Sequence, residues 1–375
     1  MITKKKYVPI IKTGDAEIKA ISNIDDNVQE FILPLFELTR GRKNQKEDEG
    51  KIAKKIQFLK DNYKDTPFIL DLTGIEDLSN TEIEQLHSSE NSYRNWINFC
   101  IEHKDEFGIF YPVVQIEEEE QYGLYIEKLN QQITELCKHF DYVVFRSQDV
   151  IEARDLISDI QDILDRESSR NINLKDKIIY VLDYKYINNV EQNVETAKTF
   201  INVLTALGIK NIVLSSTSFP ANVSEHMNPS NYISFKIKEL DFYKKVLNEV
   251  NNKDLNLVYS DYASINPIRN DNVFARGWIP RIDVPSIDKQ IHCLRKKRPE
   301  NTTYADTYIL VAREVTQKKY FKDLINQNII SWGLNTIINA ANGNVEGSAP
   351  RFWISVRMNM YLTLLEKKLS EFIAT

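Results

Sequence analysis

Eight polar residues end eight short apolar segments of the chain, and six of the eight are ionisable. They are Lys12, Glu37, Asp71, Gln115, Arg146, Asp183, Ser215 and Asp261. Two carboxylates in such a set can share general acid and base chemistry. Three can hold Mg²⁺, which prefers oxygen ligands, while Lys12 and Arg146 can bind phosphate. No diagnostic spacing distinguishes these chemistries, because each residue comes from a different segment.

A run of hydroxyl residues, Ser215-Ser-Thr-Ser218, begins at the end of the seventh segment. Barrel proteins often bind phosphate with the loops after strands seven and eight. The hydroxyl groups of Ser215 and Ser216 are therefore candidate hydrogen-bond donors to a phosphate. Turn formation and helix capping are the competing interpretation for such residues. Glycine-rich dinucleotide and P-loop motifs are absent, which argues against a standard nucleotide cradle.

These side chains lead to a definite hypothesis for the site. We expect Glu37 or Asp183 to act as acid or base, with Asp71 as the orienting or metal-holding carboxylate. The expected ligand-binding residues are Lys12, Gln115, Arg146, Ser215, Ser216 and Asp261. A solvated rim of ion pairs is the alternative, since strands turn polar wherever they reach water. The sequence leaves open whether the protein is an enzyme.

The eight apolar segments are nearly continuous, as in Phe68–Leu72 and Ile178–Asp183. Continuous apolar runs are typical of strands buried on both faces, as strands of parallel sheets are. Helical periodicity separates several of them, over residues 51–62, 123–139, 150–165, 194–207 and 241–250. Eight strand–helix units before residue 266 predict an α/β fold, a TIM-like (β/α)8 barrel. A doubly wound sheet is the main competitor.

The chain changes character after residue 266. Proline and arginine become frequent, and three of the 4 tryptophans lie there: Trp278, Trp332 and Trp353. Residues 307–311 could add a strand, and 318–328 and 352–372 read as helices. We therefore expect a barrel over residues 1–266. A mixed, mostly helical appendage over 267–375 should pack on it through the tryptophans, which bury large areas.

Composition excludes several classes of protein. The 375 residues carry 48 Lys and Arg against 54 Asp and Glu, a net charge of -6 that disfavours a general nucleic-acid binder. The 3 cysteines include no Cys-x-x-Cys pair, which suits a reducing cytoplasm and gives no zinc framework. No uninterrupted apolar stretch approaches the ~18 residues of a membrane span. The basic segments 39–43 and 295–298 are expected to be solvated, with contact to a polyanion as the alternative.

Several short motifs resemble the beta family of bacterial and phage proteins. They are Tyr7-Val-Pro-Ile-Ile-Lys12, Ile32-Leu-Pro-Leu-Phe-Glu37, Phe68-Ile-Leu-Asp71, Leu182-Asp183, Trp332-Gly333 and Trp353-Ile-Ser-Val-Arg357. Where the family pattern tends to close with histidine, this chain has Asn359-Met-Tyr361. The resemblance implies no established chemistry. It favours Lys12, Glu37, Asp71 and Asp183 as site residues and suggests a role in phage–host conflict.

We therefore expect a cytoplasmic barrel protein that binds or processes a phosphorylated or nucleotide-like ligand at a charged mouth. The cofactor is unknown, with Mg²⁺ as a candidate. The alternative is a non-catalytic interaction protein, a phage defence or accessory factor, that uses the barrel as a scaffold. The expected partner is a phosphate-bearing small molecule or a protein, with nucleic acid disfavoured and no membrane.

Overall fold

The computed structural model describes residues 5–43, 49–117, 121–167, 173–250, 252, 254–268 and 277–374. Eight parallel strands form its larger sheet, in the order β4-β3-β2-β1-β9-β7-β6-β5. These strands are β1 (Tyr7–Lys12), β2 (Leu35–Leu38), β3 (Phe68–Leu72), β4 (Phe110–Pro112), β5 (Val143–Ser147), β6 (Ile178–Tyr186), β7 (Asn211–Thr217) and β9 (Asn256–Asp261). A parallel bridge between Val113 and Val144 joins the two outermost strands. The sheet is thus a closed barrel, which confirms the predicted fold class.

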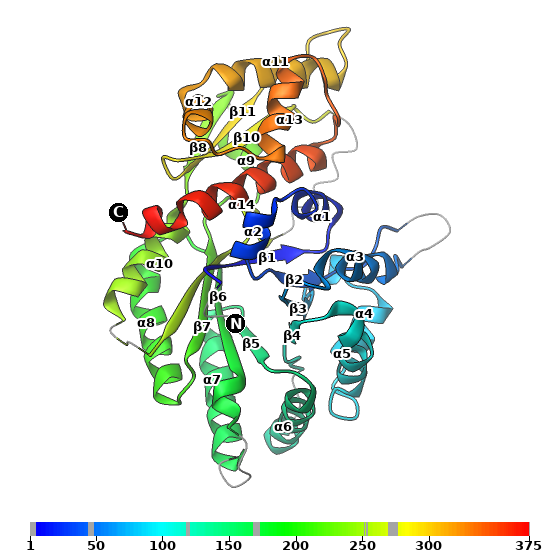
Figure 1. Ribbon diagram of the computed structural model, residues 1–375, viewed down its shortest axis with the longest axis vertical. Coiled ribbons are helices and arrows are strands. Elements are labelled where there is room, and N and C mark those ends of the chain that lie inside the picture. Colours follow the sequence, from blue (N-terminus) through cyan, green and yellow to red (C-terminus); the bar gives the residue numbers. More distant parts are fainter. Residues whose placement is uncertain are drawn as a thin grey trace.

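Helices surround this barrel (Figure 1). They are α1 (Asp15–Ile21), α2 (Asp26–Phe31), α3 (Ala53–Tyr63), α4 (Thr81–His87), α5 (Arg94–Phe107), α6 (Tyr122–His139), α7 (Val150–Glu167), α8 (Val190–Ala206) and α10 (Lys238–Glu249), with single 3₁₀ turns at Glu76–Leu78 and Leu174–Lys177. Alternate strand residues belong to two separate apolar cores, one inside the barrel and one under the helices. Burial on both faces explains why the strands are continuously apolar.

The appendage contains a three-stranded antiparallel sheet in the order β10-β11-β8. Its elements are α9 (Val223–His226), β8 (Tyr232–Lys236), β10 (Arg281–Ser286), β11 (Gln290–Arg295), α11 (Tyr304–Gln317), α12 (Lys319–Asn326), α13 (Trp332–Ala341) and α14 (Pro350–Ala374). The predicted strand at residues 307–311 is wrong, because this segment lies within α11. A short apolar segment does not distinguish a strand from a buried part of a helix, because it is too short to show either periodicity.

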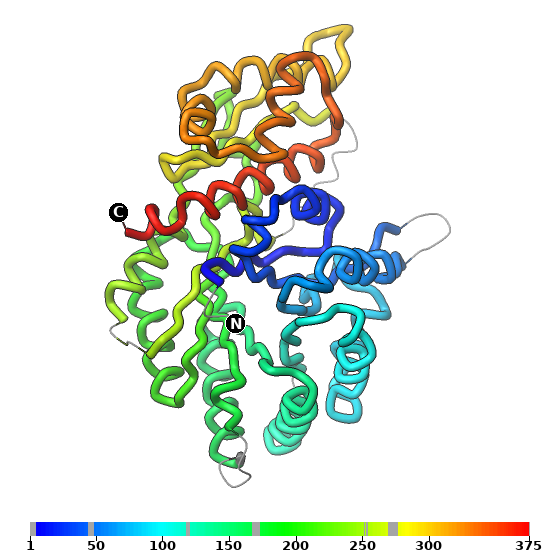
Figure 2. The backbone as a smooth tube through the Cα atoms, viewed as in Figure 1, coloured from blue at the N-terminus to red at the C-terminus, as the bar shows by residue number. Residues whose placement is uncertain are grey.

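Two segments connect the appendage with the barrel. After β7 the chain runs out to form β8, which pairs with β11, and then returns as α10 (Figure 2). Residues 232–236 therefore belong to the appendage sheet although they fall within the range predicted for the barrel. The long helix α14 crosses between the two parts and contacts α1, α2 and α10 of the barrel.

Helix α14 is buried almost all round, which is the expected pattern for a helix enclosed by protein. Asn359, at the place where the family pattern has histidine, has a structural role. Its amide donates to the backbone oxygens of Ala20 and Asn23 and accepts from the Gly333 N–H at 2.9 Å. No helix in the described ranges is long and apolar enough to cross a lipid bilayer.

Candidate functional site

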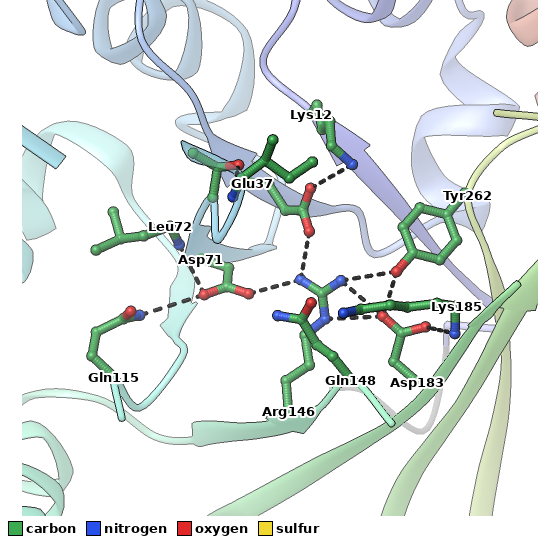
Figure 3. A network of polar contacts seen from close by, with 12 residues as sticks. Lys12, Glu37, Asp71, Leu72, Gln115, Arg146, Gln148, Asp183, Lys185 and Tyr262 are labelled. Carbon is green, nitrogen blue, oxygen red and sulfur yellow. Dashed lines mark hydrogen bonds and ion pairs between the residues drawn. The ribbon is translucent and has the colours of Figure 1, made fainter. Parts of the chain in front are cut away.

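One buried arginine organises the carboxyl ends of the barrel strands (Figure 3). Arg146, on β5, donates through Nη1 to Glu37 Oε1 and to Asp71 Oδ2, both at 2.8 Å. Its Nη2 donates to Asp183 Oδ2 at 2.8 Å. The arginine side chain is only 2% exposed, so these bonds form out of contact with bulk water. Arg146 thereby links β5 to three other strands, β2, β3 and β6.

The remaining oxygens of two of these carboxylates are also occupied. Lys12 Nζ lies 2.9 Å from Glu37 Oε2. The backbone N–H of Lys185 donates to the remaining Asp183 oxygen, Oδ1, at 2.9 Å. The Tyr262 hydroxyl donates at 2.5 Å to Asp183 Oδ2, the oxygen that also accepts from Arg146. Tyr262 was not among the predicted residues. Alternation along β9 could have identified it, because Val258 and Tyr262 both belong to the core inside the barrel.

Asp71 completes the arrangement. Its Oδ1 accepts from the Leu72 backbone N–H at 2.8 Å and from Gln115 Nε2 at 3.4 Å. Most of the predicted site residues are therefore in direct contact. We call this set the ring network, and its members are Lys12, Glu37, Asp71, Gln115, Arg146, Asp183 and Tyr262.

Two carboxyl groups of the ring network, Glu37 and Asp71, have pKa values shifted in opposite directions. Burial alone would raise the pKa of Glu37, but the neighbouring charges of Lys12 and Arg146 lower that pKa to about 2. The pKa of Asp71 is instead raised, because burial outweighs the attraction of Arg146 and Glu37 adds a like charge. Asp71 therefore takes up a proton more readily than Glu37 does. Different environments have given similar groups different proton affinities.

The arrangement does not fit a metal ion. Glu37, Asp71 and Asp183 all direct an oxygen to the Arg146 guanidinium, which fills the space where a shared cation would need to lie. In the described part of the chain, no cluster of three or more His, Cys, Asp or Glu could hold a metal. The hypothesis of Mg²⁺ at these carboxylates therefore lacks structural support.

The predicted serines lie on strand β7 rather than in a loop after it, because that strand continues to Thr217. Ser215 shares the inward alternation of Val213 and pairs in register with Asp183 and Ser260. Its Oγ is buried without a hydrogen-bond partner in the described residues. Ser216 is buried and belongs to the opposite alternation, under the helices. Neither serine lines a surface cavity that the structure shows at this end.

Asp261 lies apart from the ring network. It belongs to the outward alternation of β9, where Tyr259 Oη and Tyr361 Oη donate to its Oδ2 at 2.7 and 2.6 Å. The Tyr7 hydroxyl donates to its other oxygen. Asp261 therefore fastens α14 to the barrel wall, and its expected place in the ligand-binding set stays a prediction. A strand's period of two puts neighbouring residues on opposite faces.

A cavity of about 540 Å³ lies at this end of the barrel. Its walls come from the ends of β1 and β2, the segments after β7 and β9, the start of β10 and the first turns of α14. We call it the mouth cavity. Of the ring network only Lys12 lines it, since the others are buried beneath. The ring network thus reaches the cavity through Lys12, and its carboxylates are not part of the lining.

The mouth cavity is strongly basic. Seven cationic side chains line it, against the carboxylates of Asp15 and Glu17. The cations are Lys12, Arg40, Arg42, Lys55, Arg281, Arg351 and Arg357. The loop 39–43, expected to be solvated, thus contributes two arginines. Arg281, Arg351 and Arg357 come from beyond the predicted barrel and were missed, although Arg357 stands in the closing motif of the family.

The closed ring of eight parallel strands, with helices outside and polar side chains at the carboxyl ends, defines a (β/α)8-barrel protein of the TIM type. The model of the family described as Beta protein matches residues 7–365, and the chain belongs to that family. It is 26% identical over 360 residues to Protein beta of Enterobacteria phage P4, covering 95% of this chain and 91% of that protein.

Similar solved structures include the Pseudomonas stutzeri endoglucanase Cel5A, at 13% identity and a TM-score of 0.38. The match covers 68% of this chain and 84% of that one. The Bacillus megaterium QM B1551 spore cortex-lytic enzyme SleL is 9% identical with a TM-score of 0.31, over 84% of this chain and 68% of that enzyme.

Proposed function

We propose that the protein binds a phosphorylated small molecule in the mouth cavity. The excess of cations carries this proposal: seven basic and two acidic side chains line the cavity, in a chain whose net charge is -6. With the buried partners Glu37 and Asp283 also counted, three positive charges remain in excess. Concentrating like charge in a concave site raises the local concentration of oppositely charged ligands. The cavity volume is within the ~300–1,000 Å³ range of small-molecule sites.

The ring network supports binding more than catalysis. Each carboxylate oxygen of Glu37, Asp71 and Asp183 already accepts a hydrogen bond or takes part in an ion pair. A general base must reach the proton it removes, and these carboxylates lie under the cavity rather than in its wall. We propose that they hold Arg146 and position Lys12, whose ammonium lines the cavity. Their expected catalytic roles remain predictions, tested by turnover of a bound phosphate ester in Glu37→Gln and Asp183→Asn variants.

Isothermal titration calorimetry with pyrophosphate, ribose 5-phosphate and AMP tests the proposal. Arg42 and Arg351 are exposed residues of the lining, so their replacement should not disturb folding. A charge-assisted hydrogen bond contributes about 1.5–3 kcal/mol, so Arg42→Gln and Arg351→Gln should each weaken binding about tenfold or more. Arg154→Gln, exposed on α7 and away from the cavity, is the matched control. Failure of all three anions to bind the unaltered protein would refute the proposal.

A role in phage–host conflict is a second proposal, favoured by the phage relative. The protein would then act through its ligand or through a protein contact made by the appendage. Efficiency of plating on cells that express the unaltered chain or the Arg42→Gln, Arg351→Gln double variant tests this role. Equal plating with and without the chain, across a broad phage panel, would contradict it.

A further inference from the structure

At the appendage side of the mouth cavity, two arginines share a single carboxylate. Arg281 Nε donates to Asp283 Oδ1 at 2.7 Å, and Arg357 Nη1 donates to Asp283 Oδ2 at 2.7 Å. Both arginines line the cavity. The Arg357 and Asp283 side chains are 4% and 6% exposed, and Arg281 is 23% exposed. One carboxylate therefore serves two largely buried guanidinium groups.

The geometry leaves donors of both arginines unused. Arg281 bonds Asp283 through Nε and Nη2, and Arg357 bonds Ser264 and Asp283 through Nε and Nη1. Within the described ranges no hydrogen bond uses Arg281 Nη1 or Arg357 Nη2. A buried charge without a counter-charge is costly. A phosphate entering from the cavity would supply that counter-charge and accept a charge-assisted hydrogen bond from the unused Nη group of each arginine.

The barrel side of the cavity repeats this imbalance with different residues. Lys55 Nζ lies 3.3 Å from Asp15 Oδ1, and Arg351 Nη1 lies 3.7 Å from Asp15 Oδ2. Here too one carboxylate faces two cations, and Arg42 of the same lining has no ion pair in the described part of the chain. Arg351 and Arg357 are six residues apart on α14, which corresponds to about 9 Å along a helix axis.

Apolar side chains line the mouth cavity together with the two groups of cations. Ile354 lies between Arg351 and Arg357 in the sequence of α14, and Phe219 and Ile265 line the cavity with it. Such a surface accommodates the body of a ligand rather than its charges. The guanidinium of Arg357 lies 4.4 Å from the Phe219 ring centroid, so the apolar surface borders the arginine cluster directly.

We infer that the ligand carries two phosphates at opposite ends of a compact body, one held by Arg281 and Arg357 and the other by Lys55, Arg351 and Arg42. This inference rests on the proposed function, since it divides the same cavity into two anion subsites. A sugar bisphosphate has this chemistry. Its two charges would complete both clusters at once, whereas a monophosphate would complete only one.

Titration calorimetry with fructose 6-phosphate and fructose 1,6-bisphosphate tests the inference, because the two probes share one body. The unaltered protein should bind the bisphosphate at least tenfold more tightly. Arg281→Gln, which leaves Asp283 paired with Arg357, should remove most of that preference. Arg351→Gln should do the same from the other end. Arg281→Lys keeps the charge and serves as a folding control, and circular dichroism verifies each variant.

The possible outcomes separate the two proposals. A bisphosphate preference that falls in both variants supports the two subsites. Binding of both probes with equal affinity, or a preference unchanged in Arg281→Gln, would overturn the two-subsite inference and leave the proposed function standing. If neither these probes nor the anions used above bind the unaltered protein, the proposed function fails and the inference fails with it.

Discussion

At the scale of single residues, Arg146 is the centre of the charge network inside the barrel. Its guanidinium pairs with three buried carboxylates. Glu37 also pairs with Lys12, whereas Asp71 and Asp183 have no other cationic partner among the described residues. Arginine suits this role because its planar donors reach several acceptors at once and it stays charged. Charge compensation of Asp71 and Asp183 therefore depends on a single side chain.

Arg146→Met should destabilise the protein by about 3–5 kcal/mol, because it removes one partner of a buried charge network and leaves the others uncompensated. Urea unfolding followed by circular dichroism at neutral pH measures the loss. Arg154→Met, an exposed residue with no ion pair in the described ranges, should stay within about 0.5 kcal/mol of the unaltered protein. A loss below 1 kcal/mol for Arg146→Met would contradict the central role given to this residue.

Glu239 provides a pH-dependent contribution to stability. It is buried at the start of α10, where the Ser218 N–H donates to its Oε2 at 3.0 Å. Burial, with a smaller effect from Asp261, raises its pKa to about 8. The folded form therefore holds a proton that the unfolded chain has released, so this contribution is full below the unfolded pKa of about 4.5 and is lost as pH rises through 8.

Glu239→Gln should reveal this contribution, since the amide cannot ionise. Relative to the unaltered protein, the variant should gain stability as pH is raised from 5 to 9, by roughly 1 kcal/mol or more. Chemical unfolding at several pH values measures the difference. Asp241→Asn, a more exposed carboxylate on the same helix, serves as the comparison. A stability difference that stays constant between pH 5 and 9 would contradict the shifted pKa.

At the scale of elements, α14 belongs to both the mouth cavity and the contact between appendage and barrel. It presents Arg351 and Arg357 to the mouth cavity and Tyr361 to Asp261. It also lies very close to α13, where a Cβ added to Gly333 would come 2.4 Å from the Val356 carbonyl oxygen. Only glycine permits this approach of the two backbones.

Gly333→Ala should therefore destabilise the protein by about 1–3 kcal/mol, the usual cost of overpacking a tight contact. The obstacle is backbone, which cannot move aside as a flexible side chain can. Gly123→Ala on α6 is the matched control, because an added Cβ meets nothing within 4 Å there and alanine favours helix. Thermal unfolding should show a lowered midpoint for the first variant only. Equal midpoints for the two variants would contradict the prediction that the close packing of α13 against α14 requires glycine at position 333.

At the scale of the whole molecule, barrel and appendage share structure rather than merely touch. One apolar cluster runs from Tyr7 in the barrel to Phe372 at the end of α14. Strand β8 leaves the barrel midway through the chain and completes the appendage sheet. Division of the chain at residue 266 would leave β8 with the barrel and remove one strand from the appendage sheet. The predicted two-part division stays a prediction.

We expect barrel and appendage to unfold in one transition. In a Trp96→Phe variant the remaining tryptophans, Trp278, Trp332 and Trp353, lie in the appendage, so fluorescence reports that part alone. Far-UV circular dichroism reports all helices. Their urea transitions should coincide, as a two-state process requires. Fluorescence that changes at clearly lower urea than the helical signal would show that the appendage unfolds independently.

Much of this protein is determined by local sequence. Continuously apolar strands such as Phe68–Leu72 imply burial on both faces, and the polar residues that end them had to meet at one end of a barrel. Lys12, Glu37, Asp71, Gln115, Arg146 and Asp183 were predicted for that reason. Local periodicity is a property of neighbouring residues, so it can be read without knowing the fold.

Only the tertiary structure decided which of these groups are accessible. Sequence does not show that one arginine would bind three carboxylates and leave them outside the lining of a cavity. It did not distinguish the inward Tyr262 from the outward Asp261, because a shift of one residue reverses every side chain of a strand. Nor did it bring Arg281 and Arg357 to Asp283 beside the barrel loops. Those contacts join distant segments, and they exist only once sheet, appendage and α14 have packed together.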